Sequence, residues 1–353
     1  MPFYSSADGI GPPVWLNDGK AMLVVLDDKA GRGRIWEISY PQGQAHPVTH
    51  DLEDYDVSLG ATRDAKTIAA VSVTETANLY VAQTADLSHL HQITFGDQLI
   101  DYVTSGPNDR LLIHSAENPD GELWNMNGDG SQTALFTKHR NVGFPSLCGS
   151  FVLFVAREKE TEELIRVDSD GLNPKKLASG NVWSPSCSPD GRFIFYADLS
   201  TRPQRILRIS IDGGQPAEIA KVPGKWMVGS LSLSQNGKML AYPYQEDQPN
   251  SSSNQLSCVL VVIPSDGGTP IKTFPNVLGY VRWAPGGGGL DYYDLRDVVP
   301  QIMEQPLAGG PLRQLTKFSG GRSGGFQWSL DGKQLYVTHG ELKSNVVLIT
   351  NFR

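Results

Sequence analysis

One short pattern in the sequence has the residue types of a catalytic serine site. Residues 321–325, Gly-Arg-Ser-Gly-Gly, match the Gly-x-Ser-x-Gly pattern that holds a serine nucleophile. That pattern needs a strand, a turn and a helix around the serine, with an aspartate and a histidine later in the chain. Here a predicted strand at 326–328 follows, and His339 is the only histidine after Ser323. We therefore assign the glycines to a connection between strands and expect no catalytic residue.

Two further patterns contain residue types that bind metal ions. Residues 125–130, Asn-Met-Asn-Gly-Asp-Gly, resemble a calcium loop, but that loop needs Asp at its first position and Glu at its twelfth, which is Phe136. His89 and His91 can face one side of a strand, yet no carboxylate has the spacing of a further ligand. No glycine-rich nucleotide loop is present either. We expect no metal ion and no cofactor.

The three cysteines also give no reactive motif. Cys148, Cys187 and Cys258 are odd in number and contain no CxxC spacing. We interpret all three as small core residues in strands and expect no disulfide.

Charge and hydropathy limit the classes of partner. The chain has 353 residues, a net charge of −8 and only 19% charged residues, which disfavours nucleic acid as a partner. No apolar run reaches the length of a membrane span, so we expect no membrane insertion of this chain. The first residues lack the basic and apolar regions of a signal peptide, which predicts a cytoplasmic location if the chain is complete as given.

A repeated turn organises the rest of the chain. Ser-Pro-Asp-Gly-Arg follows Cys187, and related turns follow Trp15, Leu233 and Trp328. In such a turn proline fixes φ, aspartate bonds back to the backbone and glycine takes a positive φ, so the chain reverses between two antiparallel strands. An apolar or alternating run of strand type follows each turn.

The third strand of each repeat gives the period. Its central apolar residues are Trp36, Tyr80, Trp124, Ile165, Leu207, Val261, Met303 and Val347. They are 41 to 44 positions apart, except for one step of 54 that contains the polar segment 245–255. Four strands in about 44 residues is the pattern of a propeller blade.

We therefore predict an all-β fold in one domain, residues 1–353: an eight-bladed β-propeller of four-stranded antiparallel blades. The repeats span approximately 12–55, 56–100, 101–142, 143–182, 183–227, 228–278, 279–322 and 323–353. The last repeat ends after its third strand, so we expect the N-terminal strand Pro2–Ser6 to close the final blade. Trp15, Trp183, Trp283 and Trp328 fall near the innermost strands, where they are predicted to pack between blades.

Loops that open around the central channel are the predicted ligand-binding face. They combine charges of both signs with aromatic side chains, which suits a peptide, glycan or protein ligand. The candidate binding residues are Tyr55, His139, Arg140, Asp198, Arg202, Trp226, Glu246, Asp247, Asp294, Arg296 and Asp297.

The repeat motifs resemble those of TolB-like (PD40-type) β-propellers. A closer similarity, over nearly the whole chain, is to the C-terminal propeller of bacterial, notably acidobacterial, membrane serine/threonine protein kinases. The similarity is sharpest at Asn173–Gly180, Pro185–Tyr196, Gln305–Phe318 and Ser344–Arg353. In such kinases this region is an extracytoplasmic sensor or interaction domain, so the resemblance implies an extracytoplasmic or periplasmic location.

These features favour a non-catalytic, monomeric propeller that binds a ligand or protein, as a sensor or interaction domain of the kind attached to those kinases. Two alternatives stay open. One is a lyase or hydrolase that uses the propeller as a scaffold and acts at the channel mouth, which requires histidine and carboxylate side chains to converge there. The other is a Tol-type component of cell-envelope assembly.

Overall fold

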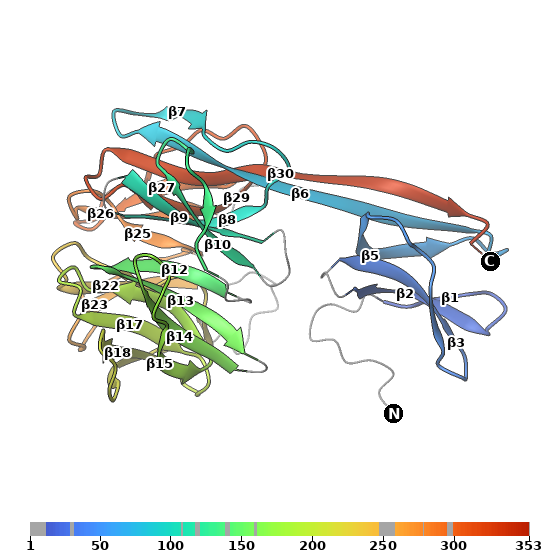
Figure 1. Cartoon of the computed structure of the whole chain (residues 1–353), viewed down its shortest axis with the longest axis horizontal. Coiled ribbons are helices and arrows are strands. Elements are labelled where there is room, and N and C mark those ends of the chain that lie inside the picture. Colours follow the sequence, from blue (N-terminus) through green and yellow to red (C-terminus); the bar gives the residue numbers. More distant parts are fainter. Residues whose placement is uncertain are drawn as a thin grey trace. The chain divides into compact units, whose positions relative to one another are not determined.

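Figure 1 shows the computed structural model of the chain. The structure describes residues 12–28, 32–106, 109–116, 121–137, 142–158, 161–246, 258–277, 279–294 and 299–352. Across these ranges the secondary structure is built from β-strands and turns, without an α-helix. No helix that is long and apolar enough to cross a membrane occurs in the described ranges.

The chain divides into two compact units. Unit 1 contains Met1–Thr76 and Glu341–Arg353, and unit 2 contains Ala77–Gly340. The division falls inside two long strands, β6 (Thr67–Gln83) and β30 (Gln334–Thr350), so each of these strands contributes residues to both units.

Five antiparallel sheets of unit 2 each follow one sequence repeat. The first two consist of β8 (Ile100–Ser105), β9 (Arg110–Ser115), β10 (Glu122–Asn127) and β11 (Ala134–Leu135), and of β12 (Val142–Cys148), β13 (Phe151–Glu158), β14 (Thr161–Asp168) and β15 (Lys175–Gly180). The third consists of β16 (Val182–Cys187), β17 (Phe193–Asp198), β18 (Arg205–Ser210) and β19 (Ala217–Lys221). The fourth consists of β20 (Trp226–Met227), β21 (Ser232–Leu233), β22 (Met239–Gln245), β23 (Cys258–Pro264) and β24 (Lys272–Pro275). The fifth consists of β25 (Val281–Trp283), β26 (Gly289–Asp294), β27 (Gln301–Pro306) and β28 (Arg313–Gln314).

The sixth sheet of unit 2 combines segments from distant parts of the sequence. β29 (Arg322–Trp328) pairs with the first part of β30, β30 pairs with β6, and β7 (Asp86–Gln92) pairs with the end of β6. Thr84 N donates a 2.8 Å hydrogen bond to Lys333 O at this end of the β6–β30 pair. Repeat 8 therefore supplies the first two strands of this sheet, and repeat 2 supplies the last two.

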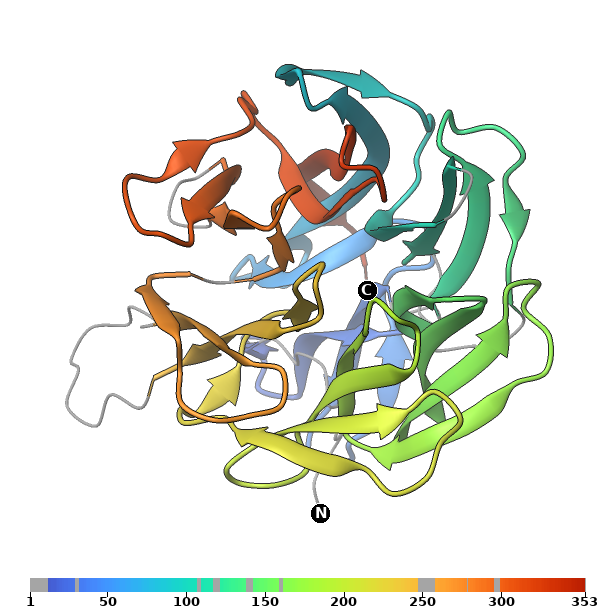
Figure 2. The same cartoon turned by 90° about the vertical axis from the view of Figure 1, so that its left-hand side faces the viewer.

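This pairing bears on the predicted number of blades. The all-β propeller of antiparallel, mostly four-stranded sheets is confirmed, but eight blades are not, because the described residues of unit 2 form six sheets around a common centre (Figure 2). β30 runs without a turn through Val347, whereas the first five sheets of unit 2 separate their second and third strands. Pro2–Ser6 lies outside the described residues, and β30 takes β6 as its partner.

Unit 1 contains a sheet and part of the shared strands. Its sheet consists of β1 (Val14–Trp15), β2 (Ala21–Asp27), β3 (Gly33–Ser39) and β4 (Ala45–Pro47), and β5 (Asp54–Ala61) pairs with the first part of β6. Alternate residues of these strands, among them Leu23, Ile35 and Ile68, are buried in one core. That core also takes Val347 and Ile349 from β30.

Adjacent sheets of unit 2 pack through apolar clusters and through glycine. One cluster joins Leu153 and Leu164 to Ile194 and Tyr196 of the next sheet. The turn between the third and fourth strands contains a glycine with positive φ, and a Cβ added at Gly171 would lie 2.4 Å from the carbonyl oxygen of Phe136. The Asp-Gly turn thus reverses the chain and also permits close contact with the preceding sheet.

A disulfide joins two adjacent sheets and corrects the expectation of free thiols. Cys148 at the end of β12 and Cys187 at the end of β16 are bonded, and Cys258 is free and buried. Both bonded cysteines directly precede the first turn of their repeats, so the repeat places them at matching positions of neighbouring inner strands. Spacing within a single motif does not reveal this pairing, but the alignment of the repeats does.

Candidate functional site

The inner strands of unit 2 meet around Arg282 of β25. Its Nε donates to Gln327 Oε1 at 2.8 Å, its Nη1 to Ser230 Oγ at 3.0 Å, and its Nη2 to the hydroxyl of Tyr102 at 2.6 Å. Gln327 lies in β29, Ser230 between β20 and β21, and Tyr102 in β8. One guanidinium therefore joins the innermost segments of four sheets.

Aromatic contacts complete a closed ring through the other two sheets. The ring centroids of Tyr102 and Phe144 are 6.3 Å apart, and those of Phe144 and Trp183 are 4.2 Å apart. The indole nitrogen of Trp183 donates to the carbonyl oxygen of Gly229 at 3.1 Å, next to Ser230. We call the six residues from the six sheets the channel ring: Tyr102, Phe144, Trp183, Ser230, Arg282 and Gln327.

Irregular pairing in the inner strands positions this ring. The register of β12 shifts between Gly143 and Ser146, and that of β16 shifts between Trp183 and Ser186. Each interval contains a proline, Pro145 or Pro185, which has no N–H to donate to the neighbouring strand. The resulting bulges turn Phe144 and Trp183 toward each other.

Two histidine pairs lie at the start of neighbouring inner strands. His114 Nδ1 is 2.5 Å from Asp101 Oδ1, and Ser323 Oγ is 3.0 Å from His339 Nδ1. A Cβ on Gly324 would lie 2.7 Å from the carbonyl oxygen of Asp101, so the two strands are in contact. Among the described residues no helix follows Ser323, but antiparallel pairing with β30 brings its hydroxyl to the His339 imidazole, a contact that the Gly-x-Ser-x-Gly pattern does not predict.

Five of the eleven predicted binding residues lie outside the described residues: His139, Arg140, Asp247, Arg296 and Asp297. Tyr55 belongs to unit 1 and is only 3% exposed, which differs from the expected position on the channel face. Its hydroxyl donates to Asp51 Oδ2 at 2.9 Å. Burial and this hydrogen bond raise the pKa of Tyr55 to about 12.

The predicted carboxylates Asp198, Asp294 and Glu246 already interact with other groups of the protein. Asp198 and Asp294 are buried at the ends of β17 and β26. Asp198 Oδ2 accepts a 2.5 Å hydrogen bond from Arg205 Nη2. Burial alone would raise the pKa of Asp198, but hydrogen bonds from Ser200 and Arg205 hold it below its ordinary value. Glu246 follows β22, and its charge adds to the burial that raises the pKa of Tyr244.

Arg202 and Trp226 are the predicted residues that the structure brings together. Arg202 lies in the loop between β17 and β18, and its guanidinium carbon is 4.3 Å from the centroid of the Trp226 ring. Lys225 Nζ is 5.5 Å from the same ring. Trp226 begins β20 and is 40% exposed, whereas Trp283 and Trp328 are buried between sheets. We call Arg202, Lys225 and Trp226 the rim cluster.

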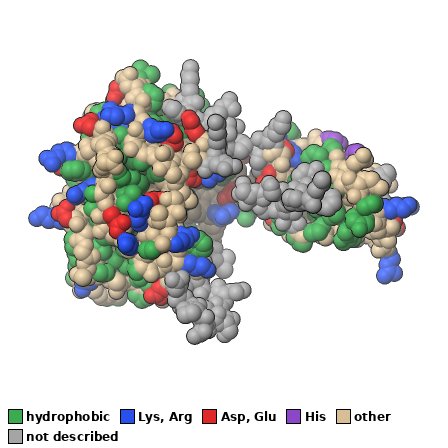
Figure 3. Space-filling view, turned by 90° about the horizontal axis from the view of Figure 1, so that it is seen from below, with side chains coloured by type: hydrophobic (Ala, Val, Ile, Leu, Met, Phe, Trp, Pro, Cys, Tyr) green, Lys and Arg blue, Asp and Glu red, His purple; other side chains and the backbone are tan. Residues whose placement is uncertain are grey.

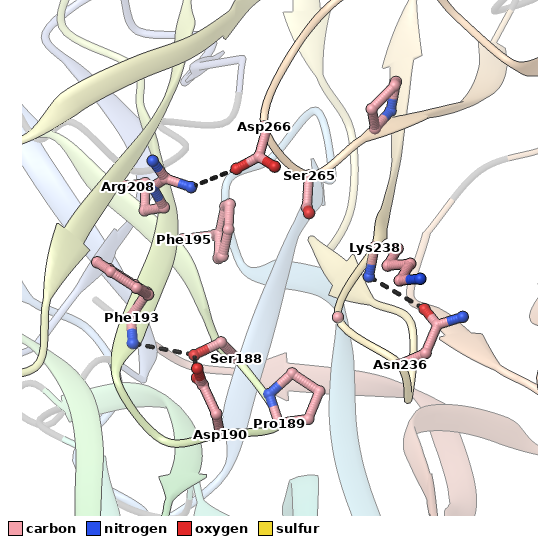
Figure 4. Close-up of a pocket in the computed structure, with 12 residues that line it drawn as sticks. Ser188, Pro189, Asp190, Phe193, Phe195, Arg208, Asn236, Lys238, Ser265 and Asp266 are labelled. Atoms are coloured by element: carbon pink, nitrogen blue, oxygen red, sulfur yellow. Dashed lines mark hydrogen bonds and ion pairs between the residues drawn. The ribbon is translucent and has the colours of Figure 1, made fainter.

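A groove between two neighbouring sheets differs from the rim cluster, because its polar groups are bonded to other groups of the protein. A groove of about 570 Å³ lies between the third and fourth sheets of unit 2, with Phe193 and Phe195 among the residues that line it (Figure 4). Across it, Arg208 Nη1 is 2.7 Å from Asp266 Oδ1, as the dashed line in Figure 4 marks. Ser188 Oγ accepts from Phe193 N at 2.9 Å. These polar groups connect the two sheets or complete a turn, so the groove is part of sheet packing.

No protein-family model and no curated protein sequence matches the chain. Among solved structures, it is similar to TolB from Acinetobacter baumannii, with a TM-score of 0.53 and 13% identity over 91% of this chain and 81% of that protein. It is also similar to a puromycin-hydrolyzing peptidase of Mycobacterium tuberculosis, with a TM-score of 0.50 and 11% identity over 89% of this chain and 55% of the peptidase. At these identities the likeness concerns the fold alone.

Proposed function

We propose that the protein is a non-catalytic propeller that binds a peptide, glycan or protein ligand at the rim cluster. The observation that carries this proposal is the exposed indole of Trp226 with two cationic side chains beside it. An indole supplies a large apolar surface with little conformational entropy to lose, and tryptophan and arginine dominate binding energy at many interfaces.

The charges of the rim cluster favour a ligand with acidic groups. Within the described residues, no carboxylate lies within 4.0 Å of the Arg202 guanidinium. Its charge is therefore available to a ligand that stacks on Trp226. Charged side chains of both signs are interspersed elsewhere on the face of unit 2 in view in Figure 3, so the specificity would come from this local combination.

A thermal-shift screen of acidic peptides, muropeptides and sugars tests the proposal. A ligand present at about 100 times its Kd stabilises the folded protein by about 2.7 kcal/mol, which raises Tm by about 5 °C or more. Trp226→Ala should abolish this rise, while Trp15→Ala, which removes an indole that is 51% exposed in unit 1, should retain it. An equal rise in the Trp226→Ala variant would refute binding at the rim cluster.

The biological setting that we propose is a sensor or interaction domain of a larger membrane kinase. The resemblance of the repeats supports this setting, and it predicts that the gene encodes a transmembrane helix and a kinase domain upstream of Met1. A Tol-type role in envelope assembly predicts instead that the protein captures a peptidoglycan-associated lipoprotein in a pull-down, and failure of that capture would remove this alternative.

A second candidate function is a hydrolase or lyase. The two histidine pairs favour it, because a hydroxyl or carboxylate within hydrogen-bond reach of an imidazole is the arrangement of acid–base catalysis. If this reading holds, turnover of ester or uronate substrates should fall at least about 100-fold in His114→Gln or Ser323→Ala. Turnover that is absent, or equal in these variants, would leave only the binding function.

A further inference from the structure

We propose that Arg282 and Tyr102 form a binding site for an organic monocarboxylate at the centre of unit 2. This site is separate from the rim cluster, and it lies within the channel ring that the six inner strands supply. The proposal does not depend on the function of Trp226.

Among the described residues, the hydrogen bonds of Arg282 reach only uncharged groups. A guanidinium has five N–H donors. Four of them reach Gln327 Oε1, Ser230 Oγ, Val281 O and the hydroxyl of Tyr102, all of which are uncharged acceptors. Among the described residues, no carboxylate lies within 4.0 Å of this guanidinium. A partly buried charge that lacks a counter-ion among the described residues carries a desolvation cost, and an anion would offset that cost.

The unused donors match the two oxygens of one carboxylate. Arg282 retains one N–H on Nη2, the nitrogen that lies 2.6 Å from the Tyr102 hydroxyl oxygen. The Tyr102 hydroxyl accepts that bond, and its own hydrogen has no acceptor among the described residues. Two donors therefore lie side by side, which is the spacing that a carboxylate accepts with its paired oxygens.

The residues near Arg282 and Tyr102 indicate which charge the ligand should carry and which group should be attached to its carboxylate. Burial raises the pKa of Tyr280, whose ring centroid is 5.5 Å from that of Tyr102; Tyr102 and the Asp101 carboxylate add to this rise, and Arg282 opposes it. The Asp101 carboxylate would repel a dianion more than a monoanion. The rings of Phe144 and Trp183 continue the aromatic surface, so the group attached to the carboxylate should be apolar or aromatic.

Isothermal titration calorimetry with benzoate, and with benzamide as its neutral counterpart, tests this site. The wild-type protein should bind benzoate and not benzamide. Arg282→Gln should weaken benzoate binding by about ten- to a hundredfold, because a hydrogen bond to a charged group is lost. Arg192→Gln removes the same charge from an exposed side chain outside the ring and should leave the affinity unchanged.

Tyr102→Phe provides a second variant in case Arg282→Gln fails to fold. It removes one of the two donors and retains the aromatic ring, so benzoate binding should weaken by about tenfold. Trp226→Ala should leave benzoate binding unchanged, which separates this site from the rim cluster.

The carboxylate could belong to a peptide C-terminus or to a small organic acid. A peptide that ends in phenylalanine, tested as the free acid and as the C-terminal amide, distinguishes the two. If the acid binds at least about tenfold more tightly than benzoate and the amide does not bind, the ligand is a chain terminus. If benzoate binds more tightly, the ligand is a small organic acid. The proposal is overturned if benzoate does not bind at about 10 mM, if benzamide binds equally well, or if folded Arg282→Gln and Tyr102→Phe bind like the wild type.

Discussion

Asp291 shows how the fold controls the chemistry of a single side chain. It lies in β26 and is fully buried, with Oδ2 accepting a 2.7 Å hydrogen bond from the indole nitrogen of Trp328. Its Oδ1 has no hydrogen-bond partner in the part of the chain that the structure describes. Burial raises the pKa of Asp291 to about 7, and the bond from Trp328 reduces this rise only in part. The carboxyl therefore keeps its proton at pH values where the unfolded chain would be ionised.

This pKa predicts a loss of stability as the pH rises. A carboxyl whose pKa is raised by folding contributes stability that is full below about pH 4 and is lost as the pH rises through about 7. Asp291→Asn keeps an acceptor for Trp328 and stays neutral. The variant should match the wild type near pH 4 and should exceed its free energy of unfolding by up to about 4 kcal/mol at pH 8, measured by urea denaturation.

Asp190→Asn is the matched control because its pKa is shifted in the opposite direction. Hydrogen bonds from Ser188 and from the backbone of Arg192 lower the pKa of Asp190. Its contribution to stability is present above the unfolded pKa and is lost as the pH falls, so the Asn variant should be less stable than the wild type at pH 8. A gain at pH 8 in both variants, or in neither, would contradict the role assigned to burial.

Adjacent sheets are joined by a repeated arrangement of arginine, phenylalanine and aspartate. Arg166 of β14 lies 4.1 Å from the centroid of Phe151, and its Nη1 is 3.1 Å from both Ile211 O and Asp212 Oδ1 of the next sheet. The same arrangement recurs one repeat later at Arg208, with Phe193 and Asp266. Sheet contact in this part of unit 2 therefore combines a cation over an aromatic ring with hydrogen bonds.

The contacts of Arg166 with Phe151 and with the backbone should contribute more to the free energy of unfolding than its ion pair with Asp212 does. Arg166→Ala should lower the free energy of unfolding by about 2 kcal/mol, because it removes ring packing and a charged hydrogen bond to the backbone. Asp212→Ala should cost less than about 0.5 kcal/mol, since the Asp212 side chain is 81% exposed and the solvent screens its charge. Urea denaturation of both variants measures the difference. Equal losses would show that the ion pair dominates.

At the scale of the whole molecule, closure depends on segments that are distant in the sequence. β29 and the first part of β30 form one sheet with the end of β6 and β7, so the ring of unit 2 needs both ends of Ala77–Gly340. The disulfide between Cys148 and Cys187 adds a covalent link between two of its sheets, across 39 positions. Such a link stabilises the fold mainly by restricting the unfolded chain.

The disulfide predicts one free thiol per denatured, unreduced chain, measured with a thiol reagent. Cys187→Ser should lower the free energy of unfolding by about 3–4 kcal/mol, the value expected for a closed loop of this length. Reducing agent should produce a similar loss in the wild type and no further loss in Cys187→Ser, while Cys258→Ala should retain the response to reduction. Three reactive thiols in the unreduced protein would contradict the pairing.

The sequence alone determined the strands and the turns of this protein. A Ser-Pro-Asp-Gly turn depends on φ values and hydrogen bonds within five residues, and an apolar run after it depends on which side chains avoid water; both are visible in any single repeat. The exposure of Trp226 also followed, because the sequence predicts it on a loop of the ligand-binding face and loops lie at the surface, although in the structure Trp226 begins β20.

Only the tertiary structure decided which repeats share a sheet and which side chains meet. Repeats 2 and 8 complete one sheet because β6 and β30 pair across more than 240 residues, and no local pattern encodes a partner at that distance. Arg282 likewise reaches Tyr102, 180 positions away, only when six inner strands converge. A repeat specifies its own strands through short-range forces, whereas the ring and its central charge exist only after the long-range contacts have formed.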